Sequence, residues 1–142
     1  MRIMCPLNYG NTKYGDFISC QANHIFKGKW ESLRDFLPLK QYTKLLAGAD
    51  VVVMYHNRCQ AGGNIGIAIL TGKKVFLKKQ STLFRLMKNY GILVFDANTI
   101  KNLSFEEFVK PLTNDQIKSN FEKYSNLFSE EKYFKYMSKL LN

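Results

Sequence analysis

Residues 56–64 hold the side chains of this sequence that are best suited to bind a phosphorylated ligand. They read HNRCQAGGN and follow an apolar, β-branched run over 50–55, which predicts a strand buried on both faces of a parallel sheet. An apolar stretch over 65–70 then predicts a helix. A strand, a glycine-containing turn and a helix N-terminus in this order present backbone N–H groups at the sheet edge where α/β proteins bind ligands. We therefore predict a diphosphate-binding corner here.

Four residues of this corner have a binding role and a structural alternative. Arg58 carries a planar guanidinium that matches pairs of phosphate oxygens, and its alternative is a solvated surface arginine. Gly62 and Gly63 would let the backbone approach a phosphate closely, or they would form an ordinary strand-to-helix turn. Asn64 would cap the following helix or contact a sugar.

Four further residues complete the corner. Gln60 and Asn57 would hydrogen-bond sugar or phosphate oxygens, and a loop-structuring role is equally open for Asn57. His56 would contact phosphate or donate a proton, although a histidine satisfied at the edge of the core is the interpretation we prefer. Cys59 next to Arg58 could be a reactive thiol, but no base is near it in sequence, so we expect a bystander.

A second candidate corner follows the first predicted strand. Asn8, Tyr9 and Gly10 form a turn there, and two such corners can flank a ligand crevice in a doubly wound domain. Tyr9 would stack on thymine or donate to a phosphate, or it would pack on the next helix.

The elements that must position these corners alternate along the chain. Strands are expected over 3–7, 30–33, 51–55, 75–77 and 92–95, and helices over 14–26, 39–47, 65–70 and 81–89. A further helix is expected to start at Ser104, and two more are expected over 114–128 and 130–141. The sequence thus predicts an α/β fold: one domain over 1–142, with a doubly wound, Rossmann-like parallel sheet flanked by helices over 1–100 and extra C-terminal helices over 101–142. The lysines beside the 75–77 strand are expected on a solvated edge: Lys73, Lys74, Lys78 and Lys79.

Composition limits the classes of function. Twenty-one Lys and Arg against eleven Asp and Glu give a net charge of +10, which indicates an anionic partner or simply a lysine-rich surface. No nucleic-acid recognition motif is present, so we expect no nucleic-acid partner. Three cysteines without paired spacing, two histidines and no carboxylate cluster predict neither disulfides nor a metal site. The unpaired cysteines make a reducing cytoplasm the expected compartment. No apolar run approaches the ~20 residues of a membrane span.

Four ordered blocks of sequence carry a resemblance to a known family. They are CPLNYGNTKYGD, FKGKWESLRDFLPLKQYTKLL, ADVVVMYHNRCQAGGNIGIAILTGKKVFL and STLFRLMKNYGILVFD, over about residues 4–96. Together they resemble the C-terminal half of the bacterial TDP-N-acetylfucosamine:lipid II N-acetylfucosaminyltransferases of glycosyltransferase family 56. The family's motif commonly has Arg-Gln-Gln where this chain has Arg58-Cys59-Gln60.

The resemblance implies the donor-binding half of a metal-independent glycosyltransferase of the B type. Such enzymes hold a TDP-sugar in a Rossmann-like C-terminal domain and transfer the sugar to a polyprenyl-diphosphate-linked acceptor. They act at the cytoplasmic face of the inner membrane, in assembly of enterobacterial common antigen or a related polysaccharide. An N-terminal half, which this sequence does not contain, would bind the acceptor. We therefore expect a fragment that binds donor without turnover and needs no cofactor besides the donor substrate, with peripheral contact to anionic lipid as a further expectation. The alternative is a non-catalytic nucleotide- or phosphate-binding regulatory module.

Overall fold

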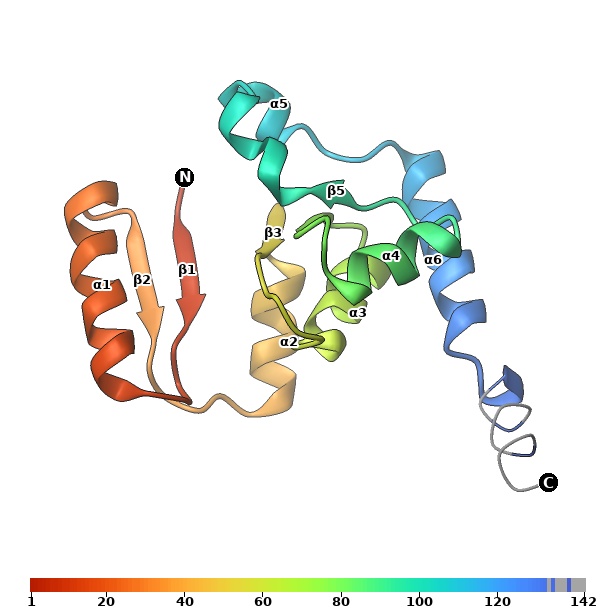
Figure 1. Ribbon diagram of the computed structural model, residues 1–142, viewed down its shortest axis with the longest axis horizontal. Helices are drawn as coiled ribbons and strands as arrows, with labels where there is room; N and C mark the ends of the chain where they lie inside the picture. The colour runs from red at the N-terminus through yellow and green to blue at the C-terminus, as the bar shows by residue number, and fades with distance from the viewer. Residues whose placement is uncertain (133, 135–137, 139–142) are drawn as a thin grey trace. The chain divides into compact units, whose positions relative to one another are not determined.

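The computed structural model describes residues 1–132, 134 and 138. The chain divides into two compact units: an N-terminal unit, Met1–Tyr42, and a C-terminal unit, Thr43–Asn142. Each has parallel strands flanked by helices, which confirms the predicted α/β class (Figure 1). The single doubly wound sheet that we expected is instead two separate parallel ladders, one in each unit.

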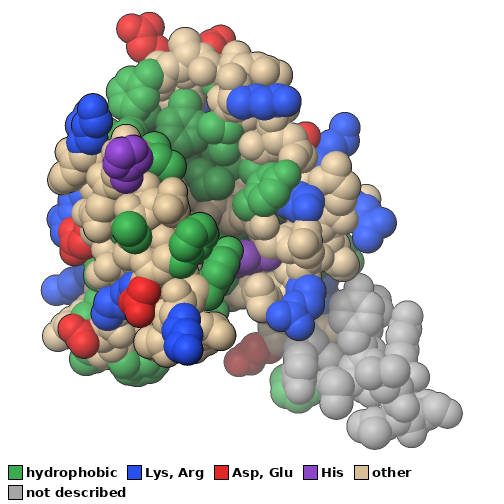
Figure 2. Space-filling model, turned by 60° about the vertical axis from the view of Figure 1, so that its left-hand side comes forward, with side chains coloured by type: hydrophobic (Ala, Val, Ile, Leu, Met, Phe, Trp, Pro, Cys, Tyr) green, Lys and Arg blue, Asp and Glu red, His purple; other side chains and the backbone are tan. Residues whose placement is uncertain are grey.

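Basic side chains are not gathered into one patch on the face drawn in Figure 2. Lys and Arg are scattered there among polar and apolar side chains. In the part of the chain that the structure describes, no helix has both the length and the apolar character needed to cross a membrane.

The N-terminal unit is a strand–helix–strand arrangement. Strand β1, Ile3–Pro6, pairs in parallel with β2, Trp30–Leu33. Helix α1, Thr12–Phe26, begins two residues earlier than predicted because the Asn11 side chain caps it, accepting from the Tyr14 N–H at 3.0 Å. It ends at Lys27 in the left-handed region.

Arg34 joins the end of β2 to α1. Its guanidinium donates to the Ser19 hydroxyl at 3.0 Å and pairs with the Asp16 carboxylate at 2.9 Å. It also lies over Gly15, where an added Cβ would be 2.7 Å from Arg34 Nη1. A glycine therefore allows the arginine to lie against the helix backbone.

The C-terminal unit has a three-stranded sheet in the order β3-β4-β5. The strands are β3 Val51–Met54, β4 Lys74–Leu77 and β5 Phe95–Asp96. The helices are α2 Leu39–Ala47, which contains the boundary between the units, α3 Gly62–Leu70, α4 Thr82–Asn89, α5 Phe105–Val109 and α6 Asn114–Leu127, with a 3-10 helix η1 over Ala97–Asn102. The core is made of apolar side chains from β3, β4, α3, α4 and the segment before β5.

The strand buried on both faces is β4 and not β3, which corrects the prediction. All four β4 residues are buried, whereas Val53 of β3 is 45% exposed and only Val52 of that strand is buried. The cause is sheet order: β4 has a hydrogen-bonded neighbour on each side, and β3 is an edge strand. The apolar composition of β3 alone does not distinguish these two positions.

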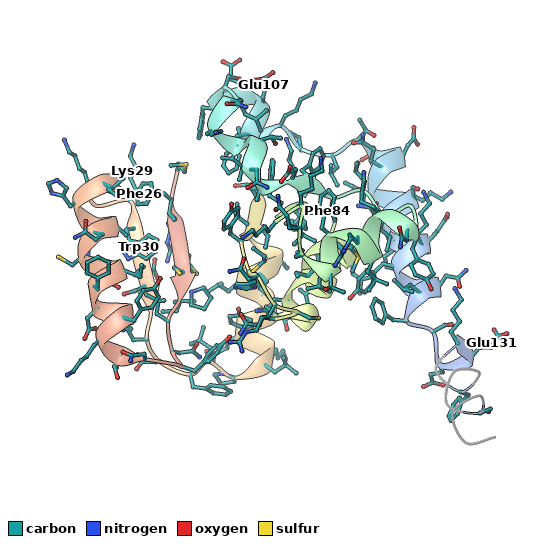
Figure 3. The ribbon with its side chains drawn as sticks, in the orientation of Figure 1. Phe26, Lys29, Trp30, Phe84, Glu107 and Glu131 are labelled. Carbon is teal, nitrogen blue, oxygen red and sulfur yellow. The ribbon has the colours of Figure 1, made fainter. Side chains whose placement is uncertain are left out.

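Lys74 also departs from the prediction of a solvated edge. It is 8% exposed, and its ammonium donates to the Glu107 backbone oxygen at 2.6 Å. The ammonium lies 5.4 Å and 5.0 Å from the ring centroids of Phe76 and Phe95, so aromatic faces replace part of its water shell. Figure 3 places Glu107 on α5, above the sheet. Lys74 therefore ties α5 to the sheet.

The C-terminal helices are confirmed as far as they are described. Helix α5 has the predicted capping box, with Ser104 and Glu107 each accepting from the other's backbone N–H. Helix α6 matches the predicted helix to within one residue, and its Tyr124 packs against α3. Of the predicted 130–141 helix, residues 130–132, 134 and 138 are helical, and the rest lies outside the described residues.

Candidate functional site

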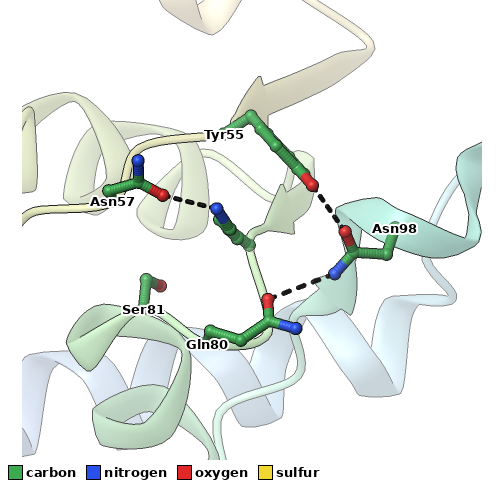
Figure 4. Close-up of a pocket in the computed structure, with 6 residues that line it drawn as sticks. Tyr55, Asn57, Gln80, Ser81 and Asn98 are labelled. Carbon is green, nitrogen blue, oxygen red and sulfur yellow. Dashed lines mark hydrogen bonds between the residues drawn. The ribbon is translucent and has the colours of Figure 1, made fainter.

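A polar pocket of about 350 Å³ lies where the three parallel strands of the C-terminal unit end. Residues that follow β3, β4 and β5 all line it, so it occupies the carboxyl edge at which open α/β sheets bind ligands. The lining residues, drawn in Figure 4, are Tyr55, Asn57, Lys78, Gln80, Ser81 and Asn98.

Hydrogen bonds connect the lining residues across the strand ends. The Tyr55 hydroxyl donates to Asn98 Oδ1 at 2.6 Å, and Asn98 Nδ2 donates to Gln80 Oε1 at 3.4 Å (Figure 4). The Lys78 ammonium donates to Asn57 Oδ1 and lies 4.9 Å from the centre of the Tyr55 ring. The segments after β3, β4 and β5 are thus cross-linked by side chains.

Three further hydrogen bonds fix lining residues of the pocket or their neighbours, and two of them come from backbone N–H groups. Asp96 Oδ1 accepts from the backbone N–H of Asn98 at 2.9 Å and from its Nδ2 at 2.8 Å, which fixes the Asn98 amide. Ser81 is buried and caps α4, its hydroxyl accepting from the Phe84 N–H at 3.1 Å. The sequence correctly predicts this cap.

A second hollow of about 550 Å³ shares Tyr55 and Asn98 with the polar pocket. Its other lining residues are Val53, Ala97, Ile100 and Lys101. The hydrogen-bonded pair Tyr55–Asn98 therefore contributes to both hollows, one mainly polar and the other with more apolar side chains.

The predicted corner after β3 is an uncapped helix N-terminus. Helix α3 begins at Gly62, three residues earlier than predicted. Its N-cap is Ala61, in the left-handed region at φ 55°, and the Ala61 side chain makes no capping hydrogen bond. Asn64 is the third residue of α3, so the structure corrects the suggestion that it caps the helix. The N–H groups of the first turn of an α-helix have no partner within the helix.

The glycines and the arginine of this corner face open space or solvent. An added Cβ at Gly62 or Gly63 would meet no heavy atom within 4 Å. Arg58 is exposed, as are Cys59 and Gln60. Arg58 takes part in no ion pair among the residues that the structure describes.

His56 and Asn57 have different surroundings. The His56 Nδ1 is buried and has no hydrogen-bond partner in the described part of the chain, so the expectation of a satisfied core-edge histidine is wrong. Asn57 is the one residue of the predicted set that lines the polar pocket.

The second predicted corner belongs to the N-terminal unit. Asn8 is half-buried, and Gly10 has a positive φ of 97°, as a tight turn requires. Tyr9 is 81% exposed, so it does not pack on the following helix.

Five of the six pocket residues were not among the predicted site residues: Tyr55, Lys78, Gln80, Ser81 and Asn98. Each follows the end of a strand by one to four residues, which is a signal present in the sequence. Lys78, which the sequence analysis expects on a solvated edge, lines the pocket, whereas Lys79 is exposed as expected.

In the described ranges, no group of three or more His, Cys, Asp or Glu side chains is arranged to hold a metal ion. Comparison of the chain with protein-family models, curated proteins and solved structures finds no match.

Proposed function

We propose that this chain binds the diphosphate of a nucleotide sugar, as the donor-binding half of a glycosyltransferase. The donor is a TDP-linked 4-acetamido-4,6-dideoxy sugar, and the acceptor is linked to a polyprenyl diphosphate at the cytoplasmic face of the membrane. The observation that carries the proposal is the uncapped N-terminus of α3 at Gly62, four residues after Arg58 in the loop that follows β3.

The charge of this corner suits a diphosphate. The first-turn N–H groups and the positive end of the helix dipole both favour an anion. Arg58 adds a permanent positive charge that is not committed to an ion pair within the described chain. In glycosyl transfer negative charge grows on the departing nucleotide, so the same groups would stabilise the leaving TDP.

The two glycines support the proposal because no contact in the described part of the chain requires a glycine at either position. Neither has a positive φ, and each would accommodate a Cβ in open space. Glycine in a helix costs up to about 1 kcal/mol relative to alanine. Close approach of a ligand to the bare backbone explains a glycine at both positions.

The nucleotide and the acceptor come from the resemblance of residues 4–96 to family 56 glycosyltransferases. On that basis the acceptor site and further catalytic groups lie on another domain, and this chain alone binds donor without transfer. The sheet edge supports ligand binding, and the family resemblance supports the choice of TDP.

Titration of the full chain with TDP by calorimetry tests the proposal. We expect saturable binding that weakens about tenfold or more in Arg58→Ala, because a hydrogen-bonded charge is lost. Arg85→Ala removes the same charge from an exposed position on α4 and serves as the matched control. Equal affinity for TDP and inorganic pyrophosphate would favour the non-catalytic phosphate-binding module instead.

A further inference from the structure

We propose that the Lys78 pocket is a second oxyanion subsite, which holds the terminal phosphoryl group of the nucleoside diphosphate. The inference rests on the proposed function and adds a position to it. Asn57 lines this pocket, and Arg58, the next residue, belongs to the α3 corner. The pocket and the α3 corner are therefore adjacent in the chain, since consecutive Cα atoms are about 3.8 Å apart, and we infer that one diphosphate spans the two.

The pocket holds two separate groups of hydrogen bonds, and a charged side chain fixes the direction of the bonds in each. A lysine ammonium can only donate, so Asn57 must turn its carbonyl oxygen toward Lys78. A carboxylate can only accept, so Asn98 must turn its amide nitrogen toward Asp96. The Asn98 carbonyl oxygen then faces Tyr55, whose hydroxyl donates to it.

Because the hydrogen bonds run in these directions, the groups of the pocket that remain free to bind a ligand are hydrogen-bond donors. The side-chain carbonyl oxygens of Asn57, Gln80 and Asn98 each accept a hydrogen bond within the network. The free groups are amide N–H atoms of Asn57 and Gln80, the remaining N–H atoms of Lys78 and the hydroxyl proton of Ser81. None of the six lining residues is acidic. A phosphoryl group, which carries negative charge and several acceptor oxygens, complements this surface.

Helix α4 adds to the positive potential of the pocket. Ser81 lines the pocket and is the N-cap of this eight-residue helix, so the positive end of the helix dipole lies at the pocket wall. Three features of the pocket therefore favour an anion: the Lys78 charge, the direction of the amides and the α4 dipole. A neutral sugar would need acceptors as well as donors from the protein, and each side-chain carbonyl oxygen of the pocket already accepts one hydrogen bond.

The test compares TDP with TMP on the full chain by calorimetry. TMP has one phosphate, which we expect at the α3 corner, so only TDP fills the Lys78 pocket. Lys78→Met should weaken TDP binding about tenfold or more, because a charged hydrogen-bond donor is lost, and change TMP binding by less than about twofold. Lys79→Met is the matched control, since it removes an exposed neighbouring charge that does not line the pocket.

A second variant guards against a folding effect at position 78. Gln80 is exposed, so Gln80→Glu should leave the fold intact while placing a negative charge at the subsite. Like Lys78→Met, this variant should weaken the binding of TDP and leave the binding of TMP nearly unchanged. Two results would show that the subsite is wrong while the proposed function stands. In the first, TDP affinity depends on Arg58, but Lys78→Met lowers it no more than Lys79→Met does. In the second, Lys78→Met lowers the affinities for TMP and TDP equally. If the unaltered chain binds no TDP, both are wrong.

Discussion

The side chain of Asn120 on α6 pairs with the backbone of Leu93 in both directions. The Leu93 N–H donates to Asn120 Oδ1 at 2.7 Å, and Asn120 Nδ2 donates to the Leu93 carbonyl oxygen at 3.0 Å. Asn120 is 2% exposed. A side-chain amide thus provides the donor and acceptor that a neighbouring strand would otherwise supply.

This pairing explains why the predicted strand over 92–95 is reduced to Phe95–Asp96. Ile92 and Val94 are buried in the core, as a strand pattern predicts. The intervening backbone is nevertheless bonded to a helix twenty-seven residues further along the chain. No local feature of residues 92–95 indicates that partner.

Replacement of Asn120 by leucine should destabilise the protein by about 2–3 kcal/mol, because the partly buried Leu93 N–H and carbonyl group lose their partner. Urea denaturation followed by circular dichroism measures the change in the free energy of unfolding. Asn126→Ala, an exposed position on the same helix, is the control and should shift stability by less than about 0.5 kcal/mol. Equal effects of the two variants would show that the Asn120–Leu93 pair contributes nothing.

Gly63→Ala should separate folding from ligand binding. The new methyl group enters open space within a helix, so we expect stability to be unchanged or to rise by up to about 1 kcal/mol. The same methyl group should obstruct a phosphate at the first turn of α3, so TDP affinity should fall. Thermal melting and calorimetry give the two readouts. A variant that binds TDP as well as the original chain would contradict the role of this corner.

Gly66→Ala, three residues along the same helix, should have the opposite effect on stability. An added Cβ there would clash with the Tyr124 hydroxyl and ring, so the Tyr124 side chain or α6 would have to shift. We expect a loss of about 1–3 kcal/mol despite the better helix propensity of alanine. Tyr124→Phe removes the clashing oxygen, and the double variant should therefore recover part of the loss. Additive effects in this double-mutant cycle would argue against the contact.

The stability of the protein should depend on the titration of Lys74. Burial lowers the pKa of this lysine below its ordinary value of 10.5, the nearby Lys110 lowers it further, and Glu107 opposes the shift. Between the lowered pKa and 10.5 the unfolded chain binds more protons than the folded one, so the contribution of Lys74 to the free energy of unfolding rises with pH through that window.

Lys74→Met removes this titration. The difference in unfolding free energy between the original chain and Lys74→Met should therefore increase from neutral pH to pH 10.5. Lys88→Met, at an exposed position on α4, should show no such trend. A difference that stays constant or falls with pH would mean that Lys74 is not desolvated in the fold.

The sequence was most informative where local signals decide the structure. Helix α2 begins and ends at the predicted residues, and the caps at Ser81 and Ser104 lie where the side-chain pattern places them. These features depend on neighbours within a few positions in the chain. The class of fold followed from the alternation of such elements.

The sequence was least informative where distant segments meet. Val53 and Val75 look alike in sequence, yet sheet order makes one an edge residue and the other central. Lys74 resembles a surface lysine until α5 supplies the Glu107 carbonyl oxygen. The polar pocket likewise depends on Asn98 meeting Tyr55, forty-three residues away. The predicted strand ends therefore indicate the edge of the sheet that holds a pocket. Of the six residues that line this pocket, the sequence analysis identified only Asn57.

The most direct measurement of the central claim is amide NMR of the full chain during titration with TDP. We predict saturable shifts at the backbone amides of Gly62 and Gly63 and at the Arg58 side chain, because these groups would contact the phosphates. Lys79→Met should leave those shifts in place, and Arg58→Ala should weaken them. Saturable shifts confined to other segments, or none at concentrations that saturate ordinary nucleotide sites, would contradict the account.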